Sequence, residues 1–263
     1  MVYSVWLFAL SVLFLVAERF WPLRRRRIFR RGFLQDIAYL LFNGEYLGVL
    51  LGIVSLQAIA TLDRGLEAAG IKTLVYLRVM EGQPLYVQIP LLLIVFDFLQ
   101  WLIHNLLHRV GWLWEFHKLH HSIEAEEMDW IGNWRFHWAE VIAYRGLLYI
   151  PAAFLGFSPA AMFAYGVFNT LIGHFAHANL NVRIGALRYL VNSPEMHRWH
   201  HTHPDSGPVN RNFGIALSVW DWLLGTANLP ENKDPGRLGF AGIENYPQGI
   251  AGRMLAPFQR SEK

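Results

Sequence analysis

The sequence predicts an all-α integral membrane protein with about four transmembrane helices and a cytosolic helical cap that holds a histidine-rich dimetal site. Three observations predict this fold class. The 263 residues are 54% hydrophobic and only 16% charged, which is more apolar than an ordinary soluble domain. Long apolar stretches recur along the chain and alternate with polar segments. All 12 histidines lie in one part of the sequence, between positions 104 and 203.

The first apolar stretch covers residues 2–17, and we expect it to anchor the chain in the membrane. No basic residue precedes it and no small-residue cleavage site follows it, so a removable signal peptide is not expected. Phe20 and Trp21 extend it toward the roughly 20 residues that a spanning helix needs. The arginine-rich segment at 24–31 comes directly afterwards and predicts that this end faces the cytoplasm.

Three further apolar stretches follow, at residues 33–62, 85–107 and 141–175. Pro151 and the residues at 156–159 interrupt the last stretch, which predicts a hairpin of two short spans or one kinked pair. Residues 63–83 are expected to form an amphipathic surface segment. If each stretch crosses the membrane in turn, all the histidine sets reach the cytoplasmic side. We expect one domain, with membrane anchors at 1–96, a histidine-motif core at 97–226 and a polar C-terminal tail at 227–263.

Ten of the histidines form four regularly spaced sets. The sets are His104 with His108, His117 with His120 and His121, His174 with His177, and His197 with His200 and His201. On a helix, residues at i, i+3 and i+4 share one face, so each set can act as a chelate. A single pair with this spacing indicates half-buried histidines on an amphipathic helix as readily as it indicates a metal chelate. Because roughly four to six imidazoles fill one iron, zinc, copper or nickel ion, ten histidines predict two metals in one shared site.

The composition also excludes other classes of site and partner. The net charge of +3 comes with one concentrated arginine segment and no basic face, so no nucleic-acid partner is expected. Cysteine is absent, which excludes disulfides, iron–sulfur clusters and thiolate zinc sites. No HExxH motif is present, and a zinc hydrolase with three ligands would leave most of the histidines unused.

Several motifs of the central region resemble one known family. In order, they are the segments at 97–108, 112–122, 135–137, 177–179, 194–201, 212–214 and 220–226. Together they resemble the fatty acid hydroxylase and sterol desaturase superfamily of membrane-bound, histidine-rich di-iron oxygenases. The resemblance implies histidine ligands at positions 104, 108, 117, 120, 121, 177, 197, 200 and 201. Asn105, Trp138 and Leu224 depart from the family pattern, but none of them removes a ligand.

The resemblance further implies a non-haem enzyme with two Fe²⁺ ions that uses O₂ and two electrons to hydroxylate a C–H bond of a lipid. Desaturation of a lipid or sterol at the same site is an alternative. A non-enzymatic membrane haem protein or metal-binding protein is an alternative from another class. The expected partners are a membrane lipid as substrate and an external electron donor, namely a ferredoxin, a b-type cytochrome or a reductase. We expect the bacterial cytoplasmic membrane, with the site on its cytoplasmic side; the oligomeric state stays open.

Other polar residues are candidates for supporting roles. His174 is a geometrically possible tenth ligand because it lies three residues before His177. Metal-bound histidines generally donate their second N–H to an acceptor, and our candidates for positions around the ligands are Asp97, His137, Asn179 and Asp221. For Asn179 and Asp221, helix capping or loop hydrogen bonding is an equally weighted alternative. We expect His203 in a solvent-facing loop and the acidic residues Glu124, Glu126, Glu127 and Asp129 on a solvated face.

Overall fold

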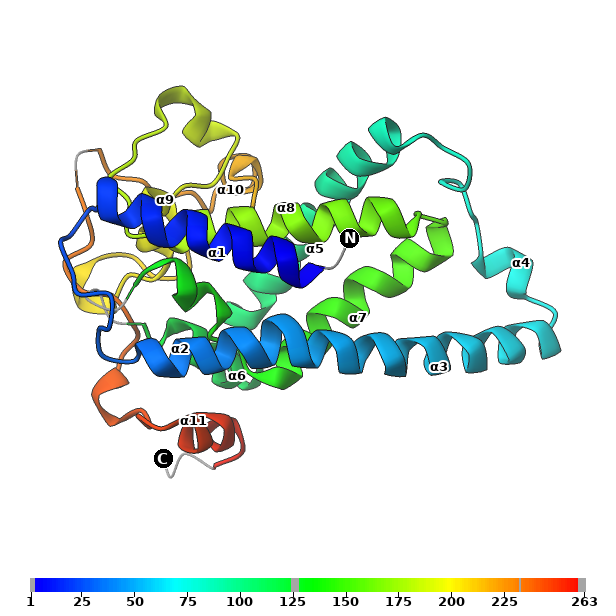
Figure 1. Cartoon of the computed structure of the whole chain (residues 1–263), viewed down its shortest axis with the longest axis horizontal. Helices are drawn as coiled ribbons and strands as arrows, with labels where there is room; N and C mark the ends of the chain where they lie inside the picture. Colours follow the sequence, from blue (N-terminus) through cyan, green and yellow to red (C-terminus); the bar gives the residue numbers. More distant parts are fainter. Residues whose placement is uncertain (1–2, 124–127, 232, 260–263) are drawn as a thin grey trace.

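The structure, a computed structural model, describes residues 3–123, 128–231 and 233–259. This part of the chain is helical and contains three isolated β-bridges but no β-strand. Figure 1 shows the long helices running along the long axis of the molecule, with shorter helices and loops gathered at one end. The prediction of an all-helical fold is confirmed for the described residues.

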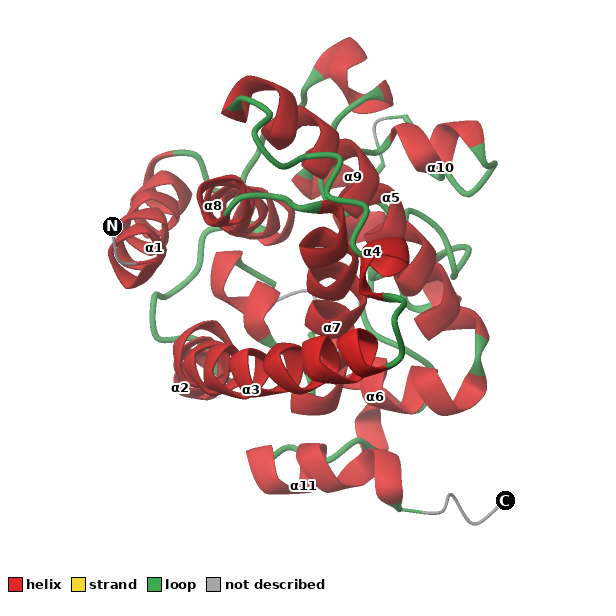
Figure 2. Ribbon diagram, turned by 90° about the vertical axis from the view of Figure 1, so that its right-hand side faces the viewer, coloured by secondary structure: helices red, strands yellow, loops and turns green. Residues whose placement is uncertain are grey.

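The first two thirds of the chain supply the long helices. Their bounds are α1 Tyr3–Phe20, α2 Phe33–Tyr39, the π-helical turn η1 Leu40–Tyr46, α3 Leu47–Ala68, α4 Lys72–Val75, α5 Leu85–Arg109, α6 Gly111–His121, the 3₁₀ turn η2 Trp130–Trp134, α7 Trp138–Leu155 and α8 Pro159–His177. The remaining elements are short: η3 Gly185–Tyr189, α9 Pro194–His200, η4 Pro204–Ser206, α10 Val219–Leu223, η5 Ile243–Asn245, α11 Ile250–Leu255 and η6 Ala256–Phe258. Figure 2 views the helices from the end at which α4 lies.

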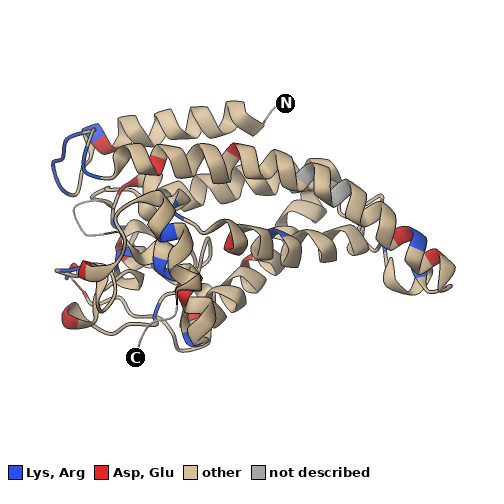
Figure 3. Cartoon of the chain, turned by 90° about the horizontal axis from the view of Figure 1, so that it is seen from below, with Lys and Arg blue, Asp and Glu red and all other residues tan. Residues whose placement is uncertain are grey.

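The outer surface of the long helices is apolar. Two of the described helices, α1 and α5, are long and apolar enough to cross a membrane, with 18 and 25 residues. Large apolar side chains on α1 and α3, such as Phe8 and Ile53, are exposed, which a soluble protein rarely allows over a continuous surface. Figure 3 shows the charged residues gathered mainly at the two ends of the molecule, with few between them. These features support a membrane protein, whereas the four-span layout with a cytosolic cap stays a prediction.

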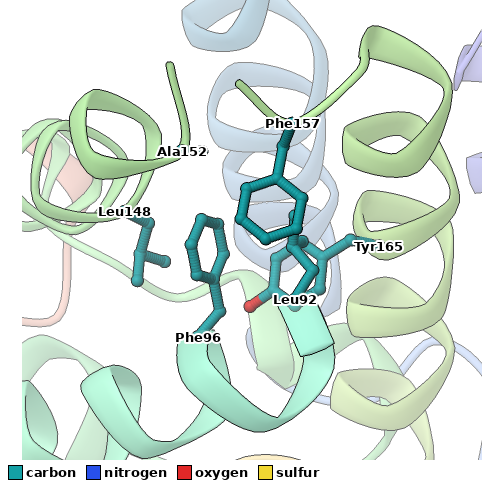
Figure 4. Packing of buried hydrophobic residues seen from close by; sticks show 6 residues of the cluster. All are labelled: Leu92, Phe96, Leu148, Ala152, Phe157 and Tyr165. Atoms are coloured by element: carbon teal, nitrogen blue, oxygen red, sulfur yellow. The ribbon is translucent and has the colours of Figure 1, made fainter. Parts of the chain in front are cut away.

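The long helices pack through a cluster of apolar side chains shown in Figure 4. Leu92 and Phe96 of α5 are fully buried against Leu148 of α7 and Tyr165 of α8. The rings of Phe96 and Tyr165 meet edge to face, with 5.1 Å between their centroids. Between membrane helices, close packing of this kind stabilises the contact, since lipid tails are as apolar as the side chains they would replace. This packing fixes α5 and α8 relative to each other, and with them the histidines at their C-terminal ends.

A tight turn joins α7 and α8, so the stretch at 141–175 forms two helices. That these two helices are short membrane spans stays a prediction. Gly156 follows the last residue of α7 with a φ of 78°, a conformation that suits glycine. The hydroxyl of Ser158 then accepts a hydrogen bond from the Ala161 N–H at 3.2 Å and caps α8. Pro159 occupies the first turn of α8, where its lack of a backbone N–H removes no hydrogen bond of the helix. The chain is thereby returned toward the end at which α6 and α9 lie.

The arginine segment packs at that same end of the molecule. The Arg30 guanidinium is buried and pairs with Asp36 at 2.7 Å and with Asp129 at 2.5 Å. Asp36 also accepts hydrogen bonds from the buried Arg135. The expectation of a solvated face is therefore wrong for Asp129, because this carboxylate neutralises a buried cation. The expectation for residues 124, 126 and 127 concerns positions outside the described residues.

The C-terminal segment, for which a polar tail was expected, contains buried apolar residues in its described part. Leu238, Phe240 and Ile243 are buried, and Phe240 and Ile243 pack with Trp114 of α6. The Met254 carbonyl of α11 accepts a hydrogen bond from the His137 ring at 3.0 Å. Apolar residues spaced among polar ones therefore fold this segment against α6 and the start of α7, where it covers the histidine-bearing end.

Candidate metal centre

Nine histidines from four helices and their ends converge into two adjacent groups. The five-histidine group consists of His104, His108, His117, His121 and His200. The four-histidine group consists of His120, His177, His197 and His201. Within each group the candidate ligand nitrogens lie within 4.8 Å of one another, and every ring except that of His108 is classed as buried. These are the nine positions that the family resemblance implied.

The helical register explains how each HxxHH set serves both groups. On α6, His117 and His121 are four residues apart and turn toward the five-histidine group, while His120 turns toward the other. At α9 the division is reversed. His197 and His201 enter the four-histidine group, and His200 enters the five-histidine group. Each set therefore bridges the two groups, which holds them side by side.

Hydrogen bonds fix the tautomers of several rings. His104 Nδ1 lies 2.8 Å from the Phe213 carbonyl, and a carbonyl can only accept, so the proton is on Nδ1. His117 Nδ1 likewise faces the carboxyl group of Glu140 at 2.8 Å. Burial raises the pKa of Glu140 to about 8, and a cation held by His117 favours the ionised carboxylate instead. With that carboxylate ionised, His117 carries its proton on Nδ1, and the Nε2 atoms of His104 and His117, 3.1 Å apart, both present lone pairs. Two facing lone pairs repel unless a cation lies between them.

The same geometry recurs in the four-histidine group. His177 donates from Nδ1 to the Gly173 carbonyl at 3.0 Å, which leaves its Nε2 as a lone pair. That Nε2 lies 3.0 Å from Nε2 of His197 and 3.3 Å from Nε2 of His120. Metal–imidazole bonds of roughly 2.1 Å at right angles place neighbouring nitrogens about 3 Å apart. The spacing of the rings therefore fits a transition metal ion in each group.

Burial keeps the α6 and α9 rings neutral. Desolvation lowers the pKa of His117, His120 and His121 well below the ordinary value, and neighbouring rings lower it further. The same causes lower the pKa of His197, His200 and His201 well below that value. Neutral imidazole is the form that binds metals. No proton has to leave these rings near neutral pH before a metal binds.

The five-histidine group has a well-defined set of outer hydrogen bonds. Besides the Phe213 carbonyl and Glu140, the Arg211 carbonyl accepts from His200 Nδ1 at 2.8 Å, and the Asn210 side chain accepts from His108 at 3.2 Å. Glu140 was missed by the sequence analysis. It stands just before the apolar stretch at 141–175, and a carboxylate beside an apolar helix was the signal that could have found it.

The four-histidine group is supported differently. Only His177 has an outer hydrogen bond to the described part of the chain, whereas Nδ1 of His120, His197 and His201 is buried without a partner there. The His120 ring instead stacks on Phe136, with 4.5 Å between centroids and an angle of 5° between the planes. Packing therefore holds the His120 ring in place, whereas hydrogen bonds to outer acceptors hold rings of the five-histidine group.

Asp97 and Asp221 lie behind the site and bind backbone. Asp221 accepts from the Phe213 N–H at 2.8 Å, from the Gly214 N–H at 2.7 Å and from the Trp101 indole at 3.0 Å. It therefore fixes the residue whose carbonyl orients His104. Asp97 accepts from the N–H groups of Ala216 and Leu217 at 2.8 and 3.1 Å and from the Trp220 indole at 2.9 Å. Neither carboxylate is hydrogen-bonded to a histidine of the two groups.

Asn179 and His137 also have structural partners. Asn179 accepts from the Arg24 N–H at 3.1 Å and donates to the Arg24 carbonyl at 2.7 Å, which ties the arginine segment to the end of α8. His137 caps α7 by accepting from the Ala139 N–H at 3.2 Å and donates to Met254. The alternative of capping or loop hydrogen bonding describes Asn179 and Asp221 better than contact with a ligand. The side chain of Asn179 binds backbone groups of Arg24, and Asp221 binds the Phe213 and Gly214 N–H groups together with two side chains, the Trp101 indole and the Thr226 hydroxyl.

His174 and His203 lie outside both histidine groups. The His174 ring stacks on Trp130 at 5.1 Å and approaches Phe14 at 5.7 Å, so α8 turns it away from His177. We therefore leave His174 out of the proposed ligand set. His203 is buried and accepts from the Asp205 N–H at 3.2 Å, which corrects the expectation of a solvent-facing position. This hydrogen bond caps the turn that follows α9.

Comparison with known families agrees with this arrangement. The model of the family described as fatty acid hydroxylase matches residues 89–226, which include all nine histidines. The chain belongs to the fatty acid hydroxylase family. No solved structure matches the chain.

Curated relatives share this region. An ornithine lipid hydroxylase from Rhizobium tropici is 33% identical over 179 residues, which cover 67% of this chain and 52% of that protein. An alkylglycerol monooxygenase from Xenopus tropicalis is 29% identical over 52% of this chain and 29% of its own length. The cholesterol 25-hydroxylase-like protein 2 of Danio rerio is 29% identical over 52% of this chain and 48% of its own. The matches thus span about half the length of these relatives or less.

Proposed function

We propose that this member of the fatty acid hydroxylase family is a membrane-bound non-haem di-iron oxygenase. It hydroxylates a C–H bond of a lipid with O₂ and two electrons from an external donor. The observation that carries the proposal is the pair of adjacent, buried groups of neutral imidazoles. The names of the relatives support the lipid, since an ornithine lipid hydroxylase and alkylglycerol monooxygenases are among them.

The donor set favours iron over zinc. Zinc in proteins is usually four-coordinate, and a catalytic zinc takes three protein ligands, whereas one group here offers five imidazoles. Imidazole suits iron, and a four-histidine group leaves positions open for other ligands. Two ferrous ions, when bound, supply the activation of O₂ and the oxidation of the substrate. The protein's own part is to hold the rings in place, with Glu140 and the carbonyls fixing their tautomers.

The close contacts between the histidine rings argue against the haem alternative. A bis-histidine haem needs two rings on opposite sides of a flat macrocycle. Here the rings contact each other directly, with centroids of His177 and His197 only 4.2 Å apart. Desaturation at the same site stays the alternative reaction, and the products distinguish it from hydroxylation.

The proposed location is the bacterial cytoplasmic membrane, with the site on the cytoplasmic side. The arginine segment at 24–31 supports this orientation, because arginines flanking a span are enriched in the cytoplasm. The segment is tied to Asn179, two residues after the ligand His177. A soluble or membrane-bound electron donor, namely a ferredoxin, a b-type cytochrome or a reductase, would reach the site from that side.

Metal analysis and lipid analysis together test the proposal. Protein purified without chelator should contain two irons per chain and show no Soret band. Lipid extracts from cells that express the chain should gain species heavier by one oxygen atom, and cells that express His120→Ala should lack them. The His174→Ala variant is the matched control, because it removes a buried histidine outside both groups. A strong Soret band, or full activity of His120→Ala, would contradict the proposal.

A further inference from the structure

A small polar hollow lies on the far side of α9 from the proposed metals. Its volume is about 90 Å³, and it lies between the end of the arginine-flanked first span and α9. The charged side chains that line it are Arg183, Arg198, Lys233, Glu195 and Asp234. A cavity of that size has room for several water-sized groups, so it can take a small charged group.

Arg198 has unused hydrogen-bonding capacity in this hollow. Its Nε donates to Asp234 at 2.5 Å, and its side chain is only 11% exposed. Its Nη1 is buried and has no partner among the described residues. A buried guanidinium donor without an acceptor is destabilising, and planar guanidinium groups match phosphate and carboxylate oxygens. Asp234 leaves Nη1 of Arg198 available to a ligand, because it contacts Nε instead. The charge of Asp234 is also paired with Arg24 at 3.0 Å.

The hollow also contains a carboxylate that no described residue binds. Glu195 lies in the first turn of α9, and no hydrogen bond or ion pair joins its side chain to the described part of the chain. The hollow therefore offers an unused cationic donor and an unused anionic acceptor close together. That combination is complementary to a group that carries both charges.

The position of the hollow places it at the membrane surface. Phe20 and Trp21 are exposed directly before Leu23, which lines the hollow, and aromatic residues of this kind mark the interface between lipid and water. We propose that the hollow binds a zwitterionic lipid headgroup, with its oxyanion on Arg198 and its ammonium group on Glu195. The bound lipid then lies beside α9, which carries ligands of both histidine groups.

Binding of short-chain lipids to the detergent-solubilised full chain tests this proposal by calorimetry. The probes are dihexanoyl-phosphatidylethanolamine, dihexanoyl-phosphatidylglycerol, which lacks the ammonium group, and inorganic phosphate. We expect phosphatidylethanolamine to bind about tenfold more tightly than either of the others. Arg198→Gln should weaken both lipids about tenfold or more, and Glu195→Gln should remove the preference for phosphatidylethanolamine. Arg188→Gln, a surface variant whose arginine pairs with Glu231 at 3.4 Å, is the matched control.

Two results would overturn the proposal. One is equal binding by the Arg198→Gln and Arg188→Gln variants; the other is inorganic phosphate binding as tightly as the lipid. Because Arg198 lies between two proposed ligands, metal content is measured on every variant. If Arg198→Gln loses metal, the Glu195→Gln comparison decides the assignment. The test uses no turnover, so its failure leaves the proposed reaction untouched.

Discussion

The five-histidine group and the four-histidine group differ in what surrounds their rings. Four rings of the first group donate to outer acceptors, which are Phe213, Glu140, Arg211 and Asn210. In the second group one ring does so within the described residues, and the others are held by packing. Outer hydrogen bonds orient metal ligands and raise their basicity. The five-histidine group is therefore arranged for tight metal binding, whereas the four-histidine group has one ring fewer and fewer outer hydrogen bonds to hold its rings in place.

The largest expected effect comes from removing a ligand. We expect His104→Ala in the five-histidine group and His177→Ala in the four-histidine group each to abolish product formation. The metal content should differ, because His177→Ala should retain one tightly bound iron, whereas His104→Ala should disturb the tighter group. Elemental analysis after passage over a chelating resin measures this difference. Equal retention of iron by the two variants would remove the distinction between the groups.

The next effect concerns Glu140. Removing an outer partner of a metal ligand typically weakens metal binding 10–100-fold, so Glu140→Gln should weaken the tighter of two binding steps by about that factor. The weaker step should change little, because no ring of the four-histidine group contacts this carboxylate. Competition with a coloured chelator measures both constants. Glu115→Gln on α6 is the control, because its side chain is 42% exposed and pairs with Lys118.

A third expectation concerns pH and applies to both groups. The pKa values of the α6 and α9 histidines are lowered in the folded protein, whereas unfolded histidine titrates near about 6.5. The folded state therefore binds fewer protons below that pH. Its stability is complete above about pH 6.5 and falls as the pH drops toward the folded pKa values. Over this range each such histidine lowers the free energy of unfolding by up to about 1.4 kcal/mol for each pH unit of acidification.

Thermal unfolding of chelator-treated protein at several pH values checks this expectation. The unfolding temperature should fall steeply below about pH 6.5. Loading with iron at neutral pH should raise that temperature, since a ligand that binds only the folded state stabilises it. A pH-independent unfolding temperature between about pH 5 and 7 would mean that the rings are not buried as neutral bases.

The smallest effect concerns Asn210. A single neutral hydrogen bond contributes about 0.5–1.5 kcal/mol, so Asn210→Ala should weaken the tighter metal-binding step by roughly 2- to 12-fold. This is less than the change expected for Glu140→Gln, because His108 is the least buried ring of its group and its acceptor is uncharged. The same competition experiment ranks the two variants. A larger effect for Asn210→Ala would reverse the ranking of the outer partners.

The sequence predicted which histidines lie together better than it predicted their surroundings. Helical spacing placed His117 and His121 on one face because that relation is local. It also suggested His174 beside His177, but three residues correspond to less than a full turn, and contacts with Trp130 and Phe14 decide where that ring points. Glu140 could not be paired with His117 from sequence, since their contact depends on how α6 packs against α7. Asp97 was a candidate for a position around the ligands, but it binds a loop more than 100 residues away, and sequence spacing cannot predict such a contact.

The central claim is that two metal ions bind per chain, one in each histidine group. Stepwise titration of chelator-treated protein with Fe²⁺ under anaerobic conditions, with free iron measured at each step, tests it most directly. We expect two equivalents to be taken up in two steps, and Glu140→Gln to weaken the tighter step. Uptake of a single equivalent, or of two equivalents in one step that Glu140→Gln does not change, would contradict it.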